Sequence, residues 1–127
     1  MSAFMYVELA WELEKLGLLW QPSIGDEVSN RKDPSRVSIL VDPNGLTPSV
    51  LRDTYLWLPT VEQLVLQLES RQAILFHAGM ELTEASMHYK AVVRAPNAQV
   101  EGIGDTLRAA VGVSLRDLLR LSSDQVH

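Results

Sequence analysis

The spacing of apolar residues changes several times along this chain, and these changes limit the fold more than any single motif does. From Ala3 to Leu16 the apolar residues recur every three or four positions, which predicts a helix with a wide apolar arc. From Arg36 to Val41 they alternate with polar ones, as in a strand with one buried face. Both periods return in the second half, so the sequence predicts an α+β fold.

The first half after the N-terminal helix is predicted to be a small antiparallel β-meander. Its strands are expected at 24–29 and 36–41, with a short return strand at 46–51. The polar segment RKDPSR separates the first two strands. The segment DPNG at 42–45 is a strong turn sequence, because proline presets φ and glycine accepts a positive φ.

The segment YLWLPT at 55–60 raises the question of a binding site, but its last residues indicate the start of a helix. Thr60 stands three residues before Gln63, the spacing of a capping box. We therefore predict a helix at 61–70. Tyr55 and Trp57 are interpreted as packing residues of the segment that leads into it.

The second half is predicted to contain two strands and a final helix. Strands are expected at 73–79 and 87–95, whereas 80–86 fits either strand or helix spacing. The segment APNAQVEG is interpreted as a loop. The last helix is expected at 105–121, with Asp105 as its N-cap.

These elements predict one α+β domain at 1–121, in which an antiparallel sheet is covered by two helices. Residues 1–58 supply the N-terminal helix and the meander, 59–121 form an α-β-β-α unit, and 122–127 are expected to be a flexible tail. The chain of 127 residues has 46% apolar and 21% charged residues, as expected for a globular domain. No apolar run approaches the roughly 20 residues of a membrane span, and no signal-peptide pattern precedes the first helix, so we expect a cytoplasmic protein without membrane contacts.

The residue types that support catalysis are sparse. There is no cysteine, and the three histidines follow no metal-binding spacing. His77 with Glu81 and Glu84 is the one enzyme-like set worth naming, and it requires those groups to converge in one pocket. We predict no catalytic residues, no cofactor and no metal site, and we do not favour an enzyme.

Nucleic-acid binding is the alternative function. His88, Lys90 and Arg94 alternate along one predicted strand and form a candidate basic face. In outline, the last 35 or so residues resemble the end of a double-stranded-RNA-binding domain, whose closing helix begins with lysines that meet phosphates. Here the matching segment reads GDTLRAAVGVSL, with Asp105 beside a single Arg108. A net charge of −5 also gives no general attraction to nucleic acid.

A second resemblance covers residues 55–121. The segments YLWLPTVEQLVLQLE and VEGIGDTLRAAVGVSLRDLL resemble small phage and prophage proteins of α-β-α sandwich fold, in which an aromatic-x-Pro-Ser/Thr sequence opens a helix. The matching positions of the closing helix are Thr106, Ala110 and Leu115. The segment PSIGDEV also resembles the Gly-Asp-x-Val opening of SH3-like β units. The phage resemblance implies a structural relationship and carries no activity or site residues to this chain.

We therefore expect a non-enzymatic accessory or protein-interaction module related to phages or mobile elements. Its candidate interaction surface is the apolar stripe of the N-terminal helix, formed by Phe4, Val7 and Trp11. The partner would be another protein or a second copy in a homo-oligomer.

Overall fold

The computed structural model describes the backbone of residues 3–43 and 45–124, and the side chains of 6–43 and 45–122. Within these ranges the chain has four helices and two antiparallel three-stranded sheets, which confirms the α+β prediction. The chain forms two compact units, of which the first ends at Pro59 and the second begins at Thr60. In the described ranges, no helix is long and apolar enough to cross a membrane.

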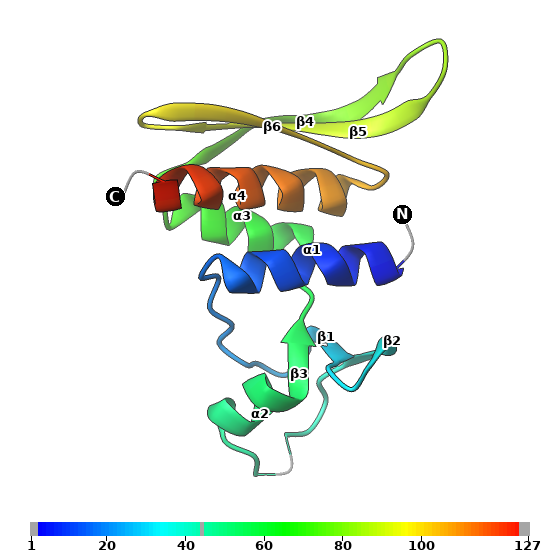
Figure 1. Ribbon diagram of the computed structural model, residues 1–127, viewed down its shortest axis with the longest axis vertical. Helices are drawn as coiled ribbons and strands as arrows, with labels where there is room; N and C mark the ends of the chain where they lie inside the picture. The colour runs from blue at the N-terminus through cyan, green and yellow to red at the C-terminus, as the bar shows by residue number, and fades with distance from the viewer. Residues whose placement is uncertain (1–2, 44, 125–127) are drawn as a thin grey trace. The chain divides into compact units, whose positions relative to one another are not determined.

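The first unit combines one long helix with a small sheet (Figure 1). Its elements are α1 (Ala3–Lys15), β1 (Glu27–Asn30), β2 (Asp33–Ile39), α2 (Pro48–Thr54) and β3 (Tyr55–Trp57). The strand order is β2-β1-β3, and both pairs are antiparallel. Val28 of the central strand lies opposite Ser38 of β2 and Trp57 of β3.

The third strand of this sheet is not where the sequence predicted it. Residues 46–51 were expected to form a strand, but α2 begins at Pro48, and Tyr55–Trp57 supplies the strand instead. Thr47 caps α2, because its hydroxyl accepts a hydrogen bond from the Val50 amide at 3.2 Å. A threonine cap followed by proline at the first helical position is a helix-start signal that outweighs the apolar residues nearby.

Two apolar clusters hold the first unit together. One contains Trp20, Val28, Leu40 and Leu51, and the other contains Val7, Ala10, Leu56 and Leu58. Asp26 is buried at 6% exposure beside the first cluster. Its Oδ2 accepts hydrogen bonds from Trp20 Nε1 at 2.8 Å and from the Ser23 amide at 3.0 Å. The buried carboxylate thus fixes the loop that leads into β1.

The second unit is a three-stranded sheet with two helices on one face (Figure 1). Its elements are α3 (Val61–Glu69), β4 (Ile74–Leu82), β5 (Met87–Ala95), β6 (Ala98–Gly104) and α4 (Leu107–Asp124). The strand order is β4-β5-β6, and both pairs are antiparallel. The helix-facing residues Ala91 and Val93 of β5 are fully buried, as are Val111 and Leu115 of α4.

The capping box at the start of α3 is confirmed. The Gln63 amide donates to Thr60 Oγ1 at 3.2 Å, and the Thr60 amide donates to Gln63 Oε1 at 3.0 Å. This exchange satisfies two backbone donors at a helix end that would otherwise have no partner in the helix.

The structure corrects two predictions for the second unit and decides one that the sequence left open. Residues 98–102 of the segment APNAQVEG, interpreted as a loop, belong to strand β6. The ambiguous segment at 80–86 continues β4 to Leu82 and then turns, with the Thr83 amide bonded to the Ser86 carbonyl at 2.8 Å. The N-cap of α4 is Thr106 and not Asp105, because Thr106 Oγ1 accepts from the Ala109 amide at 3.0 Å.

The glycines of β6 allow α4 to lie directly on the sheet. A β-carbon at Gly102 would overlap the carbonyl oxygen of Ala110 and the side chain of Ser114. Ser114 is fully buried, and its hydroxyl donates to the carbonyls of Ala91 at 3.3 Å and Ala110 at 3.1 Å. Glycine is therefore needed here for close packing, and the segment forms a regular strand.

Candidate interaction surfaces

The first unit has an apolar hollow beside α1. It has a volume of about 340 Å³ and is lined by Val7, Trp11, Pro34 and Leu56, with Glu8, Asn30 and Arg31 among the polar residues. The indole of Trp11 is 45% exposed. An exposed tryptophan at the wall of an apolar hollow is typical of a site that accepts a side chain from a ligand. We call this feature the Trp11 hollow.

Arg31 is held rigidly next to the Trp11 hollow. Its Nη2 lies 2.7 Å from Glu14 Oε1, and its Nε donates to the Arg52 carbonyl at 2.8 Å. The guanidinium carbon lies 5.7 Å from the Trp11 ring centroid, and Lys15 Nζ lies 5.1 Å from the same centroid. Two cations within about 6 Å of one indole hold the ring by cation–π attraction, so the wall of the hollow is ordered before any ligand arrives.

A second, smaller hollow shares Arg31 and Leu56 with the Trp11 hollow. It has a volume of about 210 Å³, and Trp20, Arg52 and Trp57 are among its lining residues. Arg52 Nε donates to the Trp20 carbonyl at 2.8 Å, and the Arg52 carbonyl accepts from Arg31. The hydrogen bonds of Arg31 and Arg52 therefore form one chain that runs along the walls of both hollows.

The structure separates the residues that the sequence grouped on α1. Val7 is only 6% exposed and packs with Ala10, Leu56 and Leu58, so it belongs mainly to the core of the first unit. Trp11 is exposed. The side chain of Phe4 lies outside the described residues. Sequence reasoning also missed Arg31, Pro34 and Leu56, which reach the hollow only through the folding of β1, β2 and β3.

The sheet of the second unit has an open face, opposite α3 and α4. Strand register places the candidate basic residues His88, Lys90 and Arg94 together on this face, with Val92 between them. Their cross-strand neighbours include acidic residues, because His88 lies opposite Glu81, and Val92 lies opposite Glu101. The candidate basic face is thus a mixed-charge face.

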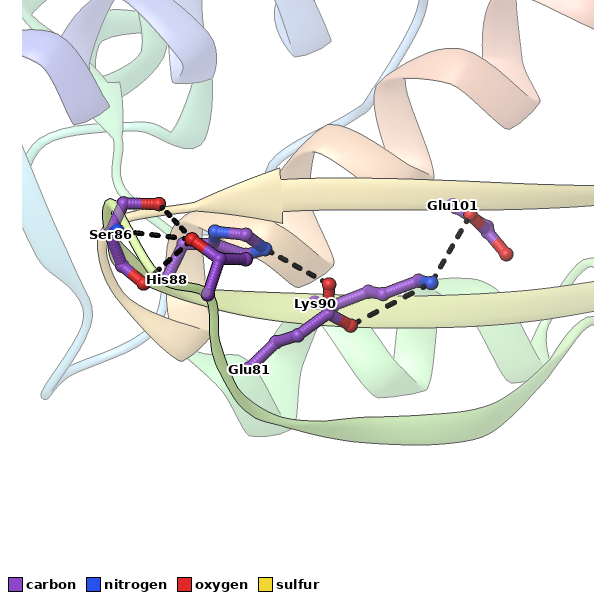
Figure 2. Close-up of polar contacts among 6 residues, drawn as sticks. Glu81, Ser86, His88, Lys90 and Glu101 are labelled. Atoms are coloured by element: carbon purple, nitrogen blue, oxygen red, sulfur yellow. Dashed lines mark hydrogen bonds and ion pairs between the residues drawn. The ribbon is translucent and has the colours of Figure 1, made fainter.

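The basic residues of the open face contact carboxylates and an amide. Figure 2 shows the carboxylates of Glu81 and Glu101 beside Lys90. Lys90 Nζ lies 3.8 Å from Glu81 Oε2 and 3.6 Å from Glu101 Oε2. His88 Nε2 is buried and lies 3.3 Å from Glu81 Oε1, close enough for an ion pair but without hydrogen-bond geometry. Arg94 donates to Gln99 Oε1 at 3.0 Å and stacks 3.5 Å from the Phe76 ring centroid.

Large apolar side chains are exposed on both faces of this sheet. Ile74, Phe76 and Ile103 lie on the open face, with 66%, 55% and 55% exposure. Met80, Leu82 and Met87 lie on the helix-facing side, yet they are 53% to 73% exposed. The β4–β5 hairpin extends past the first turn of α4 in Figure 1, which accounts for their exposure. An apolar surface of this kind is typical of a contact with another protein.

The enzyme-like set is divided between β4 and the β4–β5 turn. His77 and Glu81 lie on the open face of β4, and His77 is exposed. Glu84 is an exposed residue of the β4–β5 turn. In the described ranges, no three histidine, aspartate or glutamate side chains are arranged to hold a metal ion.

Arg71 follows the end of α3. Partial burial lowers the pKa of its guanidinium below the usual value. Its Nη1 donates to the Gln67 carbonyl and to Gln67 Oε1, each at 2.9 Å. Arg71 lines a shallow hollow of about 140 Å³ with the β5–β6 turn and Leu118. These contacts indicate a structural role at the end of α3.

In comparisons with known proteins, no family model, curated protein or solved structure matches this chain. The resemblances to phage sandwich proteins, to RNA-binding domains and to SH3-like units therefore remain predictions.

Proposed function

We propose that this chain is a non-enzymatic protein-interaction module that binds a segment of a partner protein in the Trp11 hollow. The observation that carries the proposal is the exposed indole of Trp11 at the wall of an apolar hollow of about 340 Å³. Tryptophan is enriched among the residues that contribute most of the binding energy in protein interfaces. A phage or mobile-element association stays a prediction.

The lining defines the chemistry of the bound segment. Val7, Pro34 and Leu56 offer apolar surface, so the partner inserts an apolar side chain that stacks on Trp11. Asn30 and Arg31 offer polar groups at the same hollow, which can meet the backbone of an extended segment. Because Glu14 and the Arg52 carbonyl hold Arg31 in place, binding requires little ordering of this wall.

The open sheet face supports nucleic-acid binding less well. Phosphate contacts need cations that are not already neutralised, and Lys90 lies within 4 Å of two carboxylates. Arg94 is occupied by Gln99 and Phe76. Nucleic-acid binding remains the alternative, and its test is an affinity for single- and double-stranded probes that falls steeply with salt.

A random peptide library displayed on yeast tests the proposed function directly. Peptides selected on the purified chain are synthesised, and their affinities are measured for the native protein and for Trp11→Ala. We expect the selected peptides to share an apolar residue and to lose at least about tenfold in affinity with Trp11→Ala. Ile24→Ala is the matched control, because Ile24 is a 69% exposed apolar residue of the same unit outside the hollow.

Two results contradict this proposal. Selected peptides that bind native protein and Trp11→Ala equally place the binding site elsewhere. A fall in oligomeric mass with Trp11→Glu shows instead that the hollow is filled by a second copy of the chain, in line with the sequence-based expectation of a homo-oligomer. Unchanged circular dichroism of each variant ensures that the comparison concerns binding and not folding.

A further inference from the structure

Strand β4 is an exposed edge. It is the outer strand of the β4-β5-β6 sheet, and its only strand partner in the described part of the chain is β5. Seven of its nine residues are exposed, including the large apolar residues Ile74, Phe76, Met80 and Leu82. An apolar edge strand with unpaired backbone groups is a template for another strand.

Beyond a β-bulge near its start, β4 lacks the usual protection against strand addition. Its sequence, ILFHAGMEL, contains no proline and no lysine, the residues that most often block an edge. Phe76 forms a β-bulge, because Leu75 lies opposite Val93 while His77 lies opposite the next residue, Val92. Beyond the bulge, His77–Leu82 continues in regular register with β5, so these residues form the part of the edge that can pair.

We infer that two copies of this chain pair along β4 in antiparallel orientation, with the two Gly79 residues opposite each other. This interface goes beyond the proposed function and does not depend on it. In an antiparallel pair related by a twofold axis, residues at equal distances from the centre lie opposite one another. A centre at Gly79 places His77 of each copy opposite Glu81 of the other.

Charge selects this register over its neighbours. His77 and Glu81 are the ionisable residues of β4. A centre at His77 or at Glu81 sets like groups directly opposite, which is unfavourable. A centre at Ala78 or Met80 places neither residue opposite the other. Only the centre at Gly79 creates two imidazole–carboxylate pairs, both on the open face where the two side chains already lie.

The charged groups around these pairs are compatible with the register. Glu81 already lies near His88 and Lys90 of its own chain (Figure 2), and a carboxylate can accept from several donors. The position of a β-carbon at Gly79 would lie 3.7 Å from His77 Nε2, so the imidazole leans along the strand toward the proposed centre. On the other face, Met80 comes opposite Ala78, and the exposed thioether gains an apolar neighbour.

Single cysteines test this register cleanly, because the native chain contains none. Gly79→Cys places two thiols directly opposite, within the Cα separation that a disulfide spans, and we expect nearly complete cross-linked dimer after mild oxidation. Met80→Cys is the matched control on the same strand. In this register the two thiols introduced by Met80→Cys are offset by two positions, beyond disulfide reach, so we expect little cross-linking.

Charge variants test the interface without any cross-link. Sedimentation of the native chain should show a monomer–dimer equilibrium. His77→Glu converts two imidazole–carboxylate pairs into like-charge pairs, and we expect the dimer dissociation constant to rise about tenfold or more. His77→Lys places a cation opposite Glu81 and should retain the dimer. Ile103→Glu on β6 is the control at the other edge of the sheet and should also leave the dimer unchanged.

Three outcomes would overturn this inference: a native chain that is monomeric at every concentration, equal cross-linking of the Gly79 and Met80 cysteine variants, or a dimer unaffected by His77→Glu. Loss of the dimer with Trp11→Glu, while His77→Glu has no effect, would assign self-association to the first unit instead. Because His77 is exposed, none of its substitutions removes a core contact.

Discussion

The two units of this chain each contain a three-stranded antiparallel sheet, but they are stabilised in different ways. In the first unit the strands are short, and polar contacts such as the buried one of Asp26 and the partly buried one of Arg31 connect the loops. In the second unit the strands are longer, and α4 packs on glycines of β6. In this chain, the stability of the smaller sheet depends on specific hydrogen bonds, whereas that of the larger sheet depends on the steric fit between a helix and a strand.

The largest expected effect is a loss of stability in the first unit. Asp26→Ala removes the acceptor of the buried Trp20 indole N–H and of the partly buried hydrogen bond from the Ser23 amide, which should cost about 3 kcal/mol. All three tryptophans precede Pro59, so intrinsic fluorescence reports on the first unit. In denaturant unfolding, the midpoint seen by fluorescence should fall further than that seen by far-UV circular dichroism. Asp33→Ala, at an exposed residue, should shift neither midpoint.

Gly102→Ala should lower the stability of the second unit. The added methyl group would overlap the Ala110 carbonyl, so α4 must move away from β6 at a cost of about 2 kcal/mol. Hydrogen exchange should show faster amide exchange in β6 and α4. If exchange in these elements stays at the native rate, the close approach of helix and strand is not under steric constraint. Gly79→Ala is a suitable control, because its β-carbon would meet only ordinary contacts.

A smaller effect is expected at the entry to α3. Thr60→Ala removes the hydroxyl that accepts from the Gln63 amide, and loss of such a cap costs about 1 kcal/mol. Thr60→Ser keeps the acceptor and should recover most of that stability in the same denaturant titration. Equal stability of the two variants would show that the capping box contributes little to the second unit.

The smallest effect is expected on the open sheet face. Lys90→Ala removes ion pairs to Glu81 and Glu101, which are both about half exposed, and such pairs contribute about 0.5 kcal/mol or less. The difference from the native protein should shrink further at high salt. A loss as large as that of Asp26→Ala would mean that specific polar contacts matter equally in both sheets.

Local signals in the sequence predicted the parts of the fold that depend on neighbouring residues. The helices at both ends and the capping box at Thr60 were found because their periods and caps lie within a few residues. The helix at Pro48 was missed although Thr47 and Pro48 carried a readable signal. Strand β6 was missed because glycines are typical of loops. Here they allow close contact with α4, which the local sequence does not reveal.

The candidate surfaces were harder to predict than the fold. The apolar arc of α1 is wide, and only the folded unit decides that Val7 turns inward while Trp11 stays exposed. Glu8 and Lys15, which flank Trp11 along the helix, could have indicated this. For His88, Lys90 and Arg94, a single strand showed the cations, but their carboxylate and amide partners come from the strands on either side.

The bulge at Phe76 also bears on fibril formation. A regular strand of nine residues with four exposed large apolar side chains would be an efficient seed for open-ended growth. The extra residue bends the strand and interrupts its backbone ladder near one end. Deleting Phe76 would make the whole edge regular. We then expect the strand to pair with many copies instead of one, so that the protein precipitates during synthesis and storage.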